Sequence, residues 1–324
     1  MIMKYLVGIV GKPSSGKSTF LNAACLTDAK VSELPFTTID PNQGIGYVKT
    51  KCVCKEFDVK DNPQNSYCRN GFRFIPIELL DVAGLVPDAH KGKGLGNKFL
   101  NDLSRADALL HIIDITGSLD KMGQRISPGE NDPYEDITFL ENEINFWFKD
   151  VIQREDWNKF TRQFLREKKK FVNELHSRLS GLKINDDEGM LSYISGSNSF
   201  EYIKKSKLKE AEISTLNKIK EKILDKFGST GIQDSLNYTV FEILDMICVY
   251  PVSDINNLTD NNNNILPDVF LVKKGTNLKD FINDHIHSDL AKNFIYGIDA
   301  RTKKRLSDDY ELKHNDVIKV VYRK

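Results

Sequence analysis

Two short stretches of the sequence carry residues suited to phosphate chemistry. The first, residues 11–18, reads Gly-Lys-Pro-Ser-Ser-Gly-Lys-Ser and fits the pattern G-x-x-x-x-G-K-[ST]. It follows an apolar run, residues 5–10, that predicts a buried strand, and it precedes residues 19–24, which predict the start of a helix. A loop in this context can wrap a polyphosphate with its backbone N–H groups at the helix N-terminus.

The loop supplies most of the predicted nucleotide site. Lys17 is expected to reach the β- and γ-phosphates, and the Ser18 hydroxyl is expected to bind Mg²⁺. The predicted nucleotide-binding residues are Gly11, Pro13, Ser14, Ser15, Gly16, Lys17, Ser18, Thr19 and, from the second stretch, Gly84. The alternative interpretation is an ordinary Gly/Ser turn between a strand and a helix.

The second stretch is an apolar strand that ends in Asp81 and is followed three residues later by Gly84. Asp81 is expected to hold Mg²⁺ through water, and the Gly84 amide to meet the γ-phosphate. Upstream, the irregular segment 31–42 contains Thr38, which completes the predicted metal set of Ser18, Thr38 and Asp81. The glycine-rich segment 85–100 follows no strand directly, so we interpret it as a mobile switch loop rather than a dinucleotide site.

Composition predicts a soluble globular protein of two or three domains. The 324 residues are 40% hydrophobic and 28% charged, and the formal net charge is zero. Any attraction to nucleic acid must therefore come from local patches. The apolar runs are shorter than the roughly 18 residues of a membrane span, so we expect no membrane partner and a cytoplasmic location.

The cysteines predict no structural zinc site. There are five, an odd number without C-x-x-C spacing, and Cys52 and Cys54 are expected to share one face of a strand.

Further elements follow from periodicity and turn residues. Apolar stretches near 46–57 and 72–80 predict an antiparallel pair joined by the polar connection 61–70. Residues 107–115 predict a central parallel strand with His111 as a core residue. The Asp-Pro start and apolar spacing of residues 132–147 predict an amphipathic helix.

The second half of the chain predicts helices and then short strands. Residues 151–185 read as a basic helical hairpin, which is either an RNA-binding arm or a solvated helix face, and a further helix is expected over 208–227. Between Gly117 and a helix at 237–246, only 190–194 is a plausible strand. Strands at 269–272, 294–298 and 317–321, with a helix near 278–285, predict a β-grasp unit. Its basic residues 301–305 are either an RNA-binding edge or a solvated turn.

Segments 36–42, 81–86 and 91–100 together resemble the Obg-related GTPases, in the archaeal-type form of the YchF branch, and residues 272–276 and 315–318 resemble a TGS domain. The resemblance implies an α/β fold: a P-loop NTPase with a Ras-like G domain, a helical insertion and a C-terminal β-grasp TGS domain. It also implies domain bounds, which are 1–119 with 186–245 for the G domain, 120–185 for the insertion and 246–324 for the TGS domain.

The resemblance further implies a Mg²⁺-dependent GTPase that acts as a nucleotide switch and contacts the ribosome or rRNA through the TGS domain and the helical arm. Leu85 stands where Ras-like enzymes place a water-orienting Gln, so His90 is the implied catalytic residue. A solvent-exposed loop histidine is the alternative. Ser14 stands where many relatives carry Asn, which leaves potassium dependence open.

The sequence contains no base-reading motif of the form N/T-K-x-D. Three Asn-Lys pairs occur, and the residues in the Asp position are Leu100, Thr161 and Lys220. By resemblance, the base-reading strands are missing where the chain passes from 180–185 to 189–194. Guanine or adenine preference therefore stays open, and so do three alternatives: a YchF-type ATPase, a ribosome or RNA adaptor with weak nucleotide binding, and a P-loop kinase. A kinase needs neither the Asp81–Gly84 switch nor the TGS domain.

Overall fold

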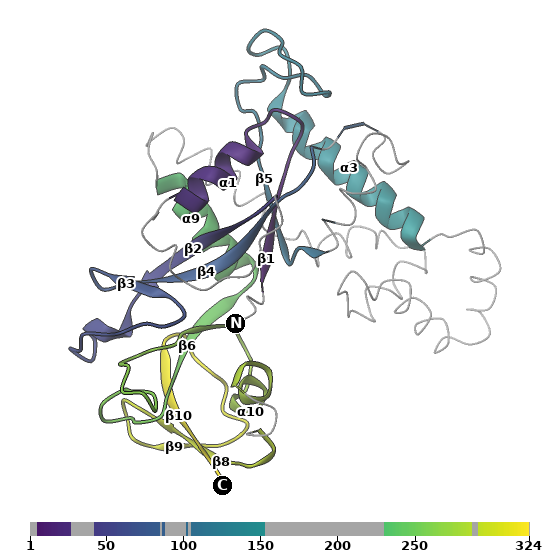
Figure 1. Cartoon of the computed structure of the whole chain (residues 1–324). Helices are drawn as coiled ribbons and strands as arrows, with labels where there is room; N and C mark the ends of the chain where they lie inside the picture. The colour runs from purple at the N-terminus through teal and green to yellow at the C-terminus, as the bar shows by residue number, and fades with distance from the viewer. Residues whose placement is uncertain are drawn as a thin grey trace, which may run out of the picture. The chain divides into compact units, whose positions relative to one another are not determined.

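The computed structural model describes residues 5–26, 42–84, 86–87, 102, 105–152, 230–286 and 291–323 (Figure 1). The chain divides into two compact units. The first unit is Met1–Ala23, Ile39–Gly44 and Glu78–Gly228, and the second unit is Ala24–Thr38, Ile45–Ile77 and Ser229–Lys324. Most of the segment between residues 10 and 81 therefore clusters with the C-terminal residues. The three-part division predicted from the sequence stays a prediction, since residues 153–229 lie outside the described part.

Strand β1 (Leu6–Val10) is the buried centre of the first sheet, whose strand order is β2-β4-β1-β5, with β3 paired to β4. All its residues are buried, which is typical of a strand with parallel neighbours on both sides. β4 (Phe72–Asp81) and β5 (Ala108–His111) run parallel to β1, with Ile9 beside Asp81 and Val10 beside His111. The carboxyl ends of these three strands therefore meet at one edge of the sheet, where α/β proteins bind ligands.

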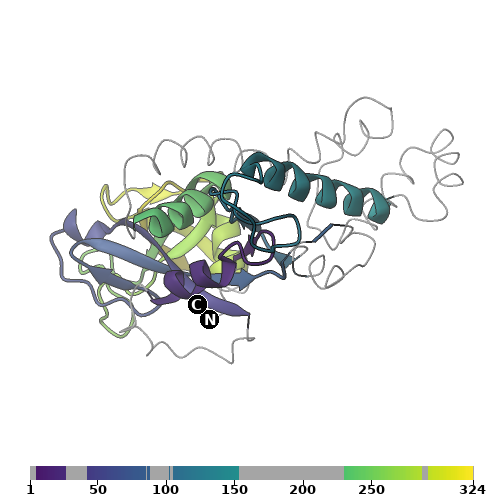
Figure 2. The ribbon, with the colours of Figure 1, turned by 90° about the horizontal axis from the view of Figure 1, so that it is seen from above.

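Two helices of the first unit follow the predicted pattern. α1 (Lys17–Leu26) begins directly after the glycine-rich loop. α3 (Pro133–Ile152) is continuous over 20 residues (Figure 1, Figure 2). Its Leu140 and Ile144 pack in one core cluster with Leu6 and Leu80. The Asp-Pro start is confirmed, because the Asp132 carboxylate accepts a hydrogen bond from the Tyr134 N–H at 2.9 Å.

β2 (Gln43–Lys51) and β4 form the predicted antiparallel pair. The Asn42 carbonyl accepts from the Asp81 N–H at one end (2.8 Å), and the Gly71 carbonyl accepts from the Cys52 N–H at the other (2.9 Å). Two predicted bounds are wrong. β2 stops at Lys51, because the 3₁₀ turn η1 (Val53–Lys55) follows. The connection also contains β3 (Tyr67–Arg69), which pairs antiparallel with β4 across an Asn70-Gly71 turn in which both residues have positive φ.

The second sheet has the strand order β7-β6-β10-β8-β9. Its strands are β6 (Met246–Val252), β7 (Phe270–Lys273), β8 (Phe294–Asp299), β9 (Arg305–Leu306) and β10 (Asp316–Tyr322). β10 runs parallel to β6 and antiparallel to β8. Two short helical segments, α10 (Leu278–Phe281) and η5 (Ile282–Ile286), bury Leu278 and Phe281 in the core of this sheet. The strands and helix predicted from residue 265 onward are confirmed.

Strand β6 lies between β7 and β10 and was not predicted. The helix expected over 237–246 begins and ends earlier than predicted: α9 (Thr230–Tyr238) passes into the π-helical turn η4 (Thr239–Ile243). Asp245 then adopts a left-handed conformation (φ 49°), which ends the helical path, and β6 begins at Met246. Pro251 lies within β6, whose residues are almost entirely buried.

Candidate nucleotide-binding site

The loop between β1 and α1 has a backbone that requires its glycines. Gly11, Ser14 and Gly16 all have positive φ (150°, 63° and 100°). A Cβ at Gly11 would lie 2.4 Å from the Ile112 carbonyl oxygen, so no larger residue fits there. The predicted strand, loop and helix are confirmed. The resulting turn brings several backbone N–H groups and the start of α1 to the carboxyl edge of the sheet.

Lys17 is a buried cation at the first position of α1. Its Nζ donates to the Lys12 carbonyl oxygen at 2.8 Å. Burial lowers the pKa of Lys17, and the nearby Asp81 carboxylate opposes this only in part. The Ser15 hydroxyl oxygen is buried and has no hydrogen-bond partner. A buried ammonium and an unpaired hydroxyl in one loop fit a ligand rich in anionic oxygens, such as a polyphosphate.

Ser18 and Asp81 are brought into direct contact. The Ser18 hydroxyl, one residue into α1, donates to Oδ2 of Asp81, the last residue of β4. Hydroxyl and carboxylate oxygens are the donors that Mg²⁺ prefers, so this pair fits the metal that the sequence predicts. Thr38 and His90 lie outside the described residues, and Thr19 is exposed on α1.

Gly84 packs directly against the loop. A Cβ at Gly84 would lie 2.9 Å from Pro13 Cγ and 3.0 Å from the Pro13 nitrogen. Gly123 approaches the same residue, because a Cβ there would lie 2.5 Å from the Pro13 carbonyl oxygen. The two predicted stretches, 11–18 and 81–84, therefore touch. Gly123 was missed, because nothing in its local sequence links it to the loop.

Lys12 occupies a variable position of the motif and was also missed. It is buried, and its Nζ donates to the Leu119 carbonyl oxygen (2.7 Å) and to Oδ1 of Asp136 on α3 (3.0 Å). Asn131 donates to the same carboxylate oxygen at 3.2 Å. These contacts attach the loop to the segment that follows β5 and to α3.

His111 lies at the end of β5, where the sequence predicted a core residue. Burial lowers its pKa to about 4, and the neighbouring positive charge of Lys17 acts in the same direction, while Glu141 opposes them. The imidazole is therefore neutral at physiological pH, so it adds no second positive charge beside Lys17.

Three family models match successive parts of the chain. A model described as "50S ribosome-binding GTPase" matches residues 6–147, and a TGS domain model matches residues 262–322. Between them, a model described as "Obg-like GTPase YGR210-like, G4 motif-containing domain" matches residues 157–254. The phosphate loop, the Ser18–Asp81 contact and the first sheet thus define a P-loop protein of the GTPase class.

Individual proteins place the chain more narrowly. The uncharacterized GTP-binding protein MJ1332 of Methanocaldococcus jannaschii is 39% identical over 394 aligned positions, which cover 98% of this chain and 98% of that protein. A crystal structure of a GTP binding protein from Pyrococcus horikoshii OT3 is 33% identical, with a TM-score of 0.70, over 98% of this chain and 99% of that one. The ribosome-binding ATPase YchF of Bacillus subtilis is 37% identical over 144 residues, which are 44% of this chain and 36% of that protein. The chain belongs to the Obg-related family of GTP-binding proteins, in its YchF-type branch.

The match to the M. jannaschii protein also shows an internal difference in length. Its 394 aligned positions exceed the 324 residues of this chain, so at least 70 of them have no counterpart here. Because 98% of both chains is aligned, most of the missing positions are internal. Residues 157–254 match a model named for a G4 motif, yet they contain no N/T-K-x-D.

Within the described part of the chain, every helix is too short or too polar to span a lipid bilayer.

Proposed function

We propose that this chain binds a nucleoside triphosphate together with Mg²⁺ at residues 11–18, hydrolyses it, and acts as a nucleotide switch. The contact between Ser18 and Asp81 carries the proposal, because it joins the loop after β1 to the end of β4 at the edge where α1 begins. A structural turn has no need of a buried lysine, an unpaired buried hydroxyl and a carboxylate at the same place.

The residues would divide the work as follows. Lys17 and the backbone amides of Gly11, Ser14, Ser15, Gly16, Ser18 and Thr19 bind the phosphates, whereas Pro13, which has no N–H, helps to shape the loop. Ser18 and Thr38 supply oxygens for Mg²⁺, and Asp81 holds it through water; the bound metal would neutralise charge on the phosphate oxygens. Gly84 offers its amide to the γ-phosphate, and its packing on Pro13 supports this role. His90 orients or deprotonates the attacking water.

GTP is the substrate that kinship favours, and ATP is the alternative. The M. jannaschii and P. horikoshii proteins are named as GTP-binding, whereas the B. subtilis relative is named as an ATPase. The absence of a base-reading carboxylate from the sequence leaves both nucleotides open.

We also propose that the protein works in the cytoplasm on the ribosome or its RNA, through the TGS domain and the basic segment 151–185. The name of the B. subtilis relative and that of the family model over residues 6–147 both refer to ribosome binding. Within the basic turn 301–305, Arg301 already donates to Glu56 Oε2 at 2.7 Å and to the Asn315 carbonyl oxygen. Lys304 and Arg305 are exposed and are the better candidates for RNA phosphates.

A second candidate function is a ribosome or RNA adaptor in which the nucleotide is a weak ligand. The observation that favours it is the loss of at least 70 positions relative to the 394 aligned with the M. jannaschii protein, together with the missing base-reading motif.

Titration of the full chain with fluorescent mant-GTP and mant-ATP, with and without Mg²⁺, separates the two functions. We expect Mg²⁺-dependent binding that Lys17→Ala abolishes and that Lys274→Ala, an exposed lysine of the second unit, leaves unchanged. Phosphate release then shows whether the bound nucleotide is hydrolysed. Failure of the parent chain to bind either nucleotide, while it still sediments with ribosomes, would leave only the adaptor.

A further inference from the structure

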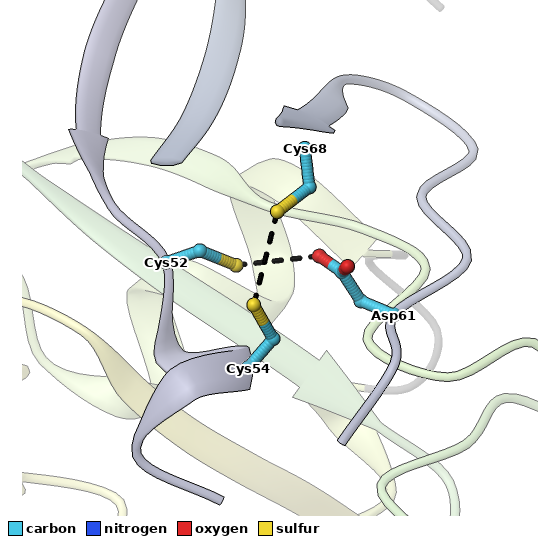
Figure 3. Close-up of side chains that lie close together, drawn as sticks. All are labelled: Cys52, Cys54, Asp61 and Cys68. Atoms are coloured by element: carbon cyan, nitrogen blue, oxygen red, sulfur yellow. Dashed lines mark hydrogen bonds between the residues drawn. The ribbon is translucent and has the colours of Figure 1, made fainter. Parts of the chain in front are cut away.

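Four potential metal ligands meet in the second unit. The ligand atoms of Cys52, Cys54, Asp61 and Cys68, here called the cysteine cluster, all lie within 4.8 Å of one another. Figure 3 shows the four side chains pointing toward a common centre. None of these residues belongs to the proposed nucleotide site.

The cluster corrects the interpretation of the cysteines from sequence. That interpretation placed Cys52 and Cys54 on one face of a strand, but β2 ends at Lys51 and Cys54 lies in the 3₁₀ turn η1. The turn directs both sulfurs to one centre. Asp61 reaches it from the following loop, and Cys68 reaches it from β3. Six residues separate Cys54 from Asp61, and six more separate Asp61 from Cys68. These side chains meet only because of the turn η1 and the β3–β4 hairpin.

Two distances between the ligand atoms match the edges of a tetrahedral metal site. With Zn–S of about 2.3 Å and Zn–O of about 2.0 Å, a tetrahedron has S···S edges of about 3.8 Å and S···O edges of about 3.5 Å. Cys54 Sγ and Cys68 Sγ are 3.7 Å apart, and Cys52 Sγ and Asp61 Oδ2 are 3.3 Å apart. A disulfide would need about 2 Å between sulfurs, and the structure has all five cysteines free.

A buried arginine beside the cluster fits a negatively charged metal complex. Arg73 is fully buried, with Nη2 3.2 Å from Asp61 Oδ2, and its Nε has no hydrogen-bond partner. The guanidinium also donates to Ser66 Oγ and to the Leu266 carbonyl oxygen, and it lies 5.3 Å from the centroid of the Tyr250 ring. Three thiolates and one carboxylate around Zn²⁺ leave an excess of negative charge, which a cation in contact with a ligand reduces.

We propose that Cys52, Cys54, Asp61 and Cys68 bind one structural Zn²⁺. Zinc suits a tetrahedral, mostly thiolate donor set, and four protein ligands leave no open position for catalysis. Binding would replace the thiol protons, which leave to solvent, by the metal.

The metal would fix the loop that holds the start of β7. Directly after Asp61, the Asn62 N–H donates to the Ile265 carbonyl oxygen (2.8 Å) and the Gln64 N–H donates to that of Pro267 (2.7 Å). The Asn65 side chain exchanges two hydrogen bonds with the Val269 backbone, at 2.8 and 3.0 Å. A metal at Asp61 therefore anchors the loop whose backbone supports residues 265–269.

Metal analysis of the untagged full chain, purified in reducing buffer without chelator, tests the proposal. We expect one zinc per chain by plasma mass spectrometry, and loss of that zinc in the double variant Cys54→Ser/Cys68→Ser. Cys25→Ser is the matched control, because Cys25 lies outside the cluster and should leave the zinc content unchanged. A parent chain that contains no zinc and takes up none on incubation would overturn the proposal, as would a Cys54–Cys68 disulfide or stoichiometric iron in its place.

Cobalt substitution tests the ligand set. Co²⁺ in the parent chain should show the visible bands of tetrahedral cobalt and thiolate charge-transfer absorption. Asp61→Cys should keep the metal and raise the charge-transfer intensity by about one third, because four thiolates replace three. An unchanged intensity in Asp61→Cys would show that Asp61 is not a ligand. Neither measurement depends on nucleotide binding, so either proposal can fail without the other.

Discussion

Lys12 and Asp136 form a buried ion pair that joins the phosphate loop to α3. Nζ lies 2.9 Å from Oδ2, and the two side chains are 2% and 6% exposed. The lysine is one residue into the loop, and the aspartate is in the first turn of the helix. A buried ion pair at this place fixes the position of the loop that also contains Lys17, the residue proposed to bind the phosphates.

Asp136→Ala should destabilise the first unit by about 3 kcal/mol, because it leaves the Lys12 ammonium buried and unpaired. Glu135→Ala, at the neighbouring position, is the control. Glu135 forms an ion pair with Lys121, but both side chains are more than half exposed, so we expect the free energy of unfolding to change by no more than about 0.5 kcal/mol. Urea unfolding followed by circular dichroism measures both. Equal effects of the two substitutions would contradict the structural role given to the buried pair.

Gly84→Ala should lower nucleotide affinity about tenfold. The added Cβ meets Pro13 at 2.9 to 3.0 Å, two of its three contacts are backbone atoms that cannot rotate away, and overpacking of this kind costs about 1–3 kcal/mol. Gly231→Ala in α9 controls for the loss of glycine itself, since a Cβ there meets nothing within 4 Å. Titration of the two variants with mant-nucleotides measures the effect. An unchanged affinity in Gly84→Ala would refute the predicted contact between the Gly84 amide and the γ-phosphate.

His111 should make the protein less stable in acid. Its pKa falls from about 6.5 in the unfolded chain to about 4 in the fold, so between these values only the unfolded state takes up the proton. The contribution of the neutral His111 to the free energy of unfolding is therefore complete above pH 6.5, and it is lost as the pH falls toward 4. His111→Gln should remove up to about 3 kcal/mol of this pH dependence. This pH dependence is measured from the free energies of unfolding of parent and variant at a series of pH values. The range from pH 7 to 8 is the internal control, because the two proteins should differ there by a constant amount.

The sequence was sufficient wherever a local pattern fixes both conformation and chemistry. The pattern of residues 11–18 was enough to predict the conformation of the loop, because glycine is needed at positive φ. The flanking strand and helix could be predicted from the few residues on either side. The sequence also assigned Ser18 and Asp81 to one metal site, and the structure brings the two side chains together, since parallel strands end at one edge. Three of the four described strands after residue 265 were predicted to within about two residues at each end, and the two-residue strand β9 was not predicted.

The sequence was insufficient where a contact depends on how distant segments pack. Nothing near Lys12 identifies Asp136 as its partner, more than a hundred positions away. The cysteine cluster depends on the end of β2 at Lys51, and hydrophobic alternation alone would have continued that strand. β6 was missed because a helix was predicted to continue to residue 246, whereas Asp245 ends the helical path and the strand begins at Met246.

Nucleobase selectivity should be weak in this chain. A pocket that hydrogen-bonds a base rejects analogues lacking the partner group by about 10⁴-fold or more, but here no N/T-K-x-D carboxylate is present and at least 70 of the 394 positions aligned with the M. jannaschii relative are absent. We therefore expect mant-GTP and mant-ATP to bind within about tenfold of each other, and inorganic tripolyphosphate to compete with both. The M. jannaschii protein, measured in parallel, is the comparator and should favour GTP by a larger factor. A preference for GTP in this chain as strong as in the comparator would mean that another segment reads the base. Lys17→Ala should abolish binding of both nucleotides, because the phosphates then supply almost all of the affinity.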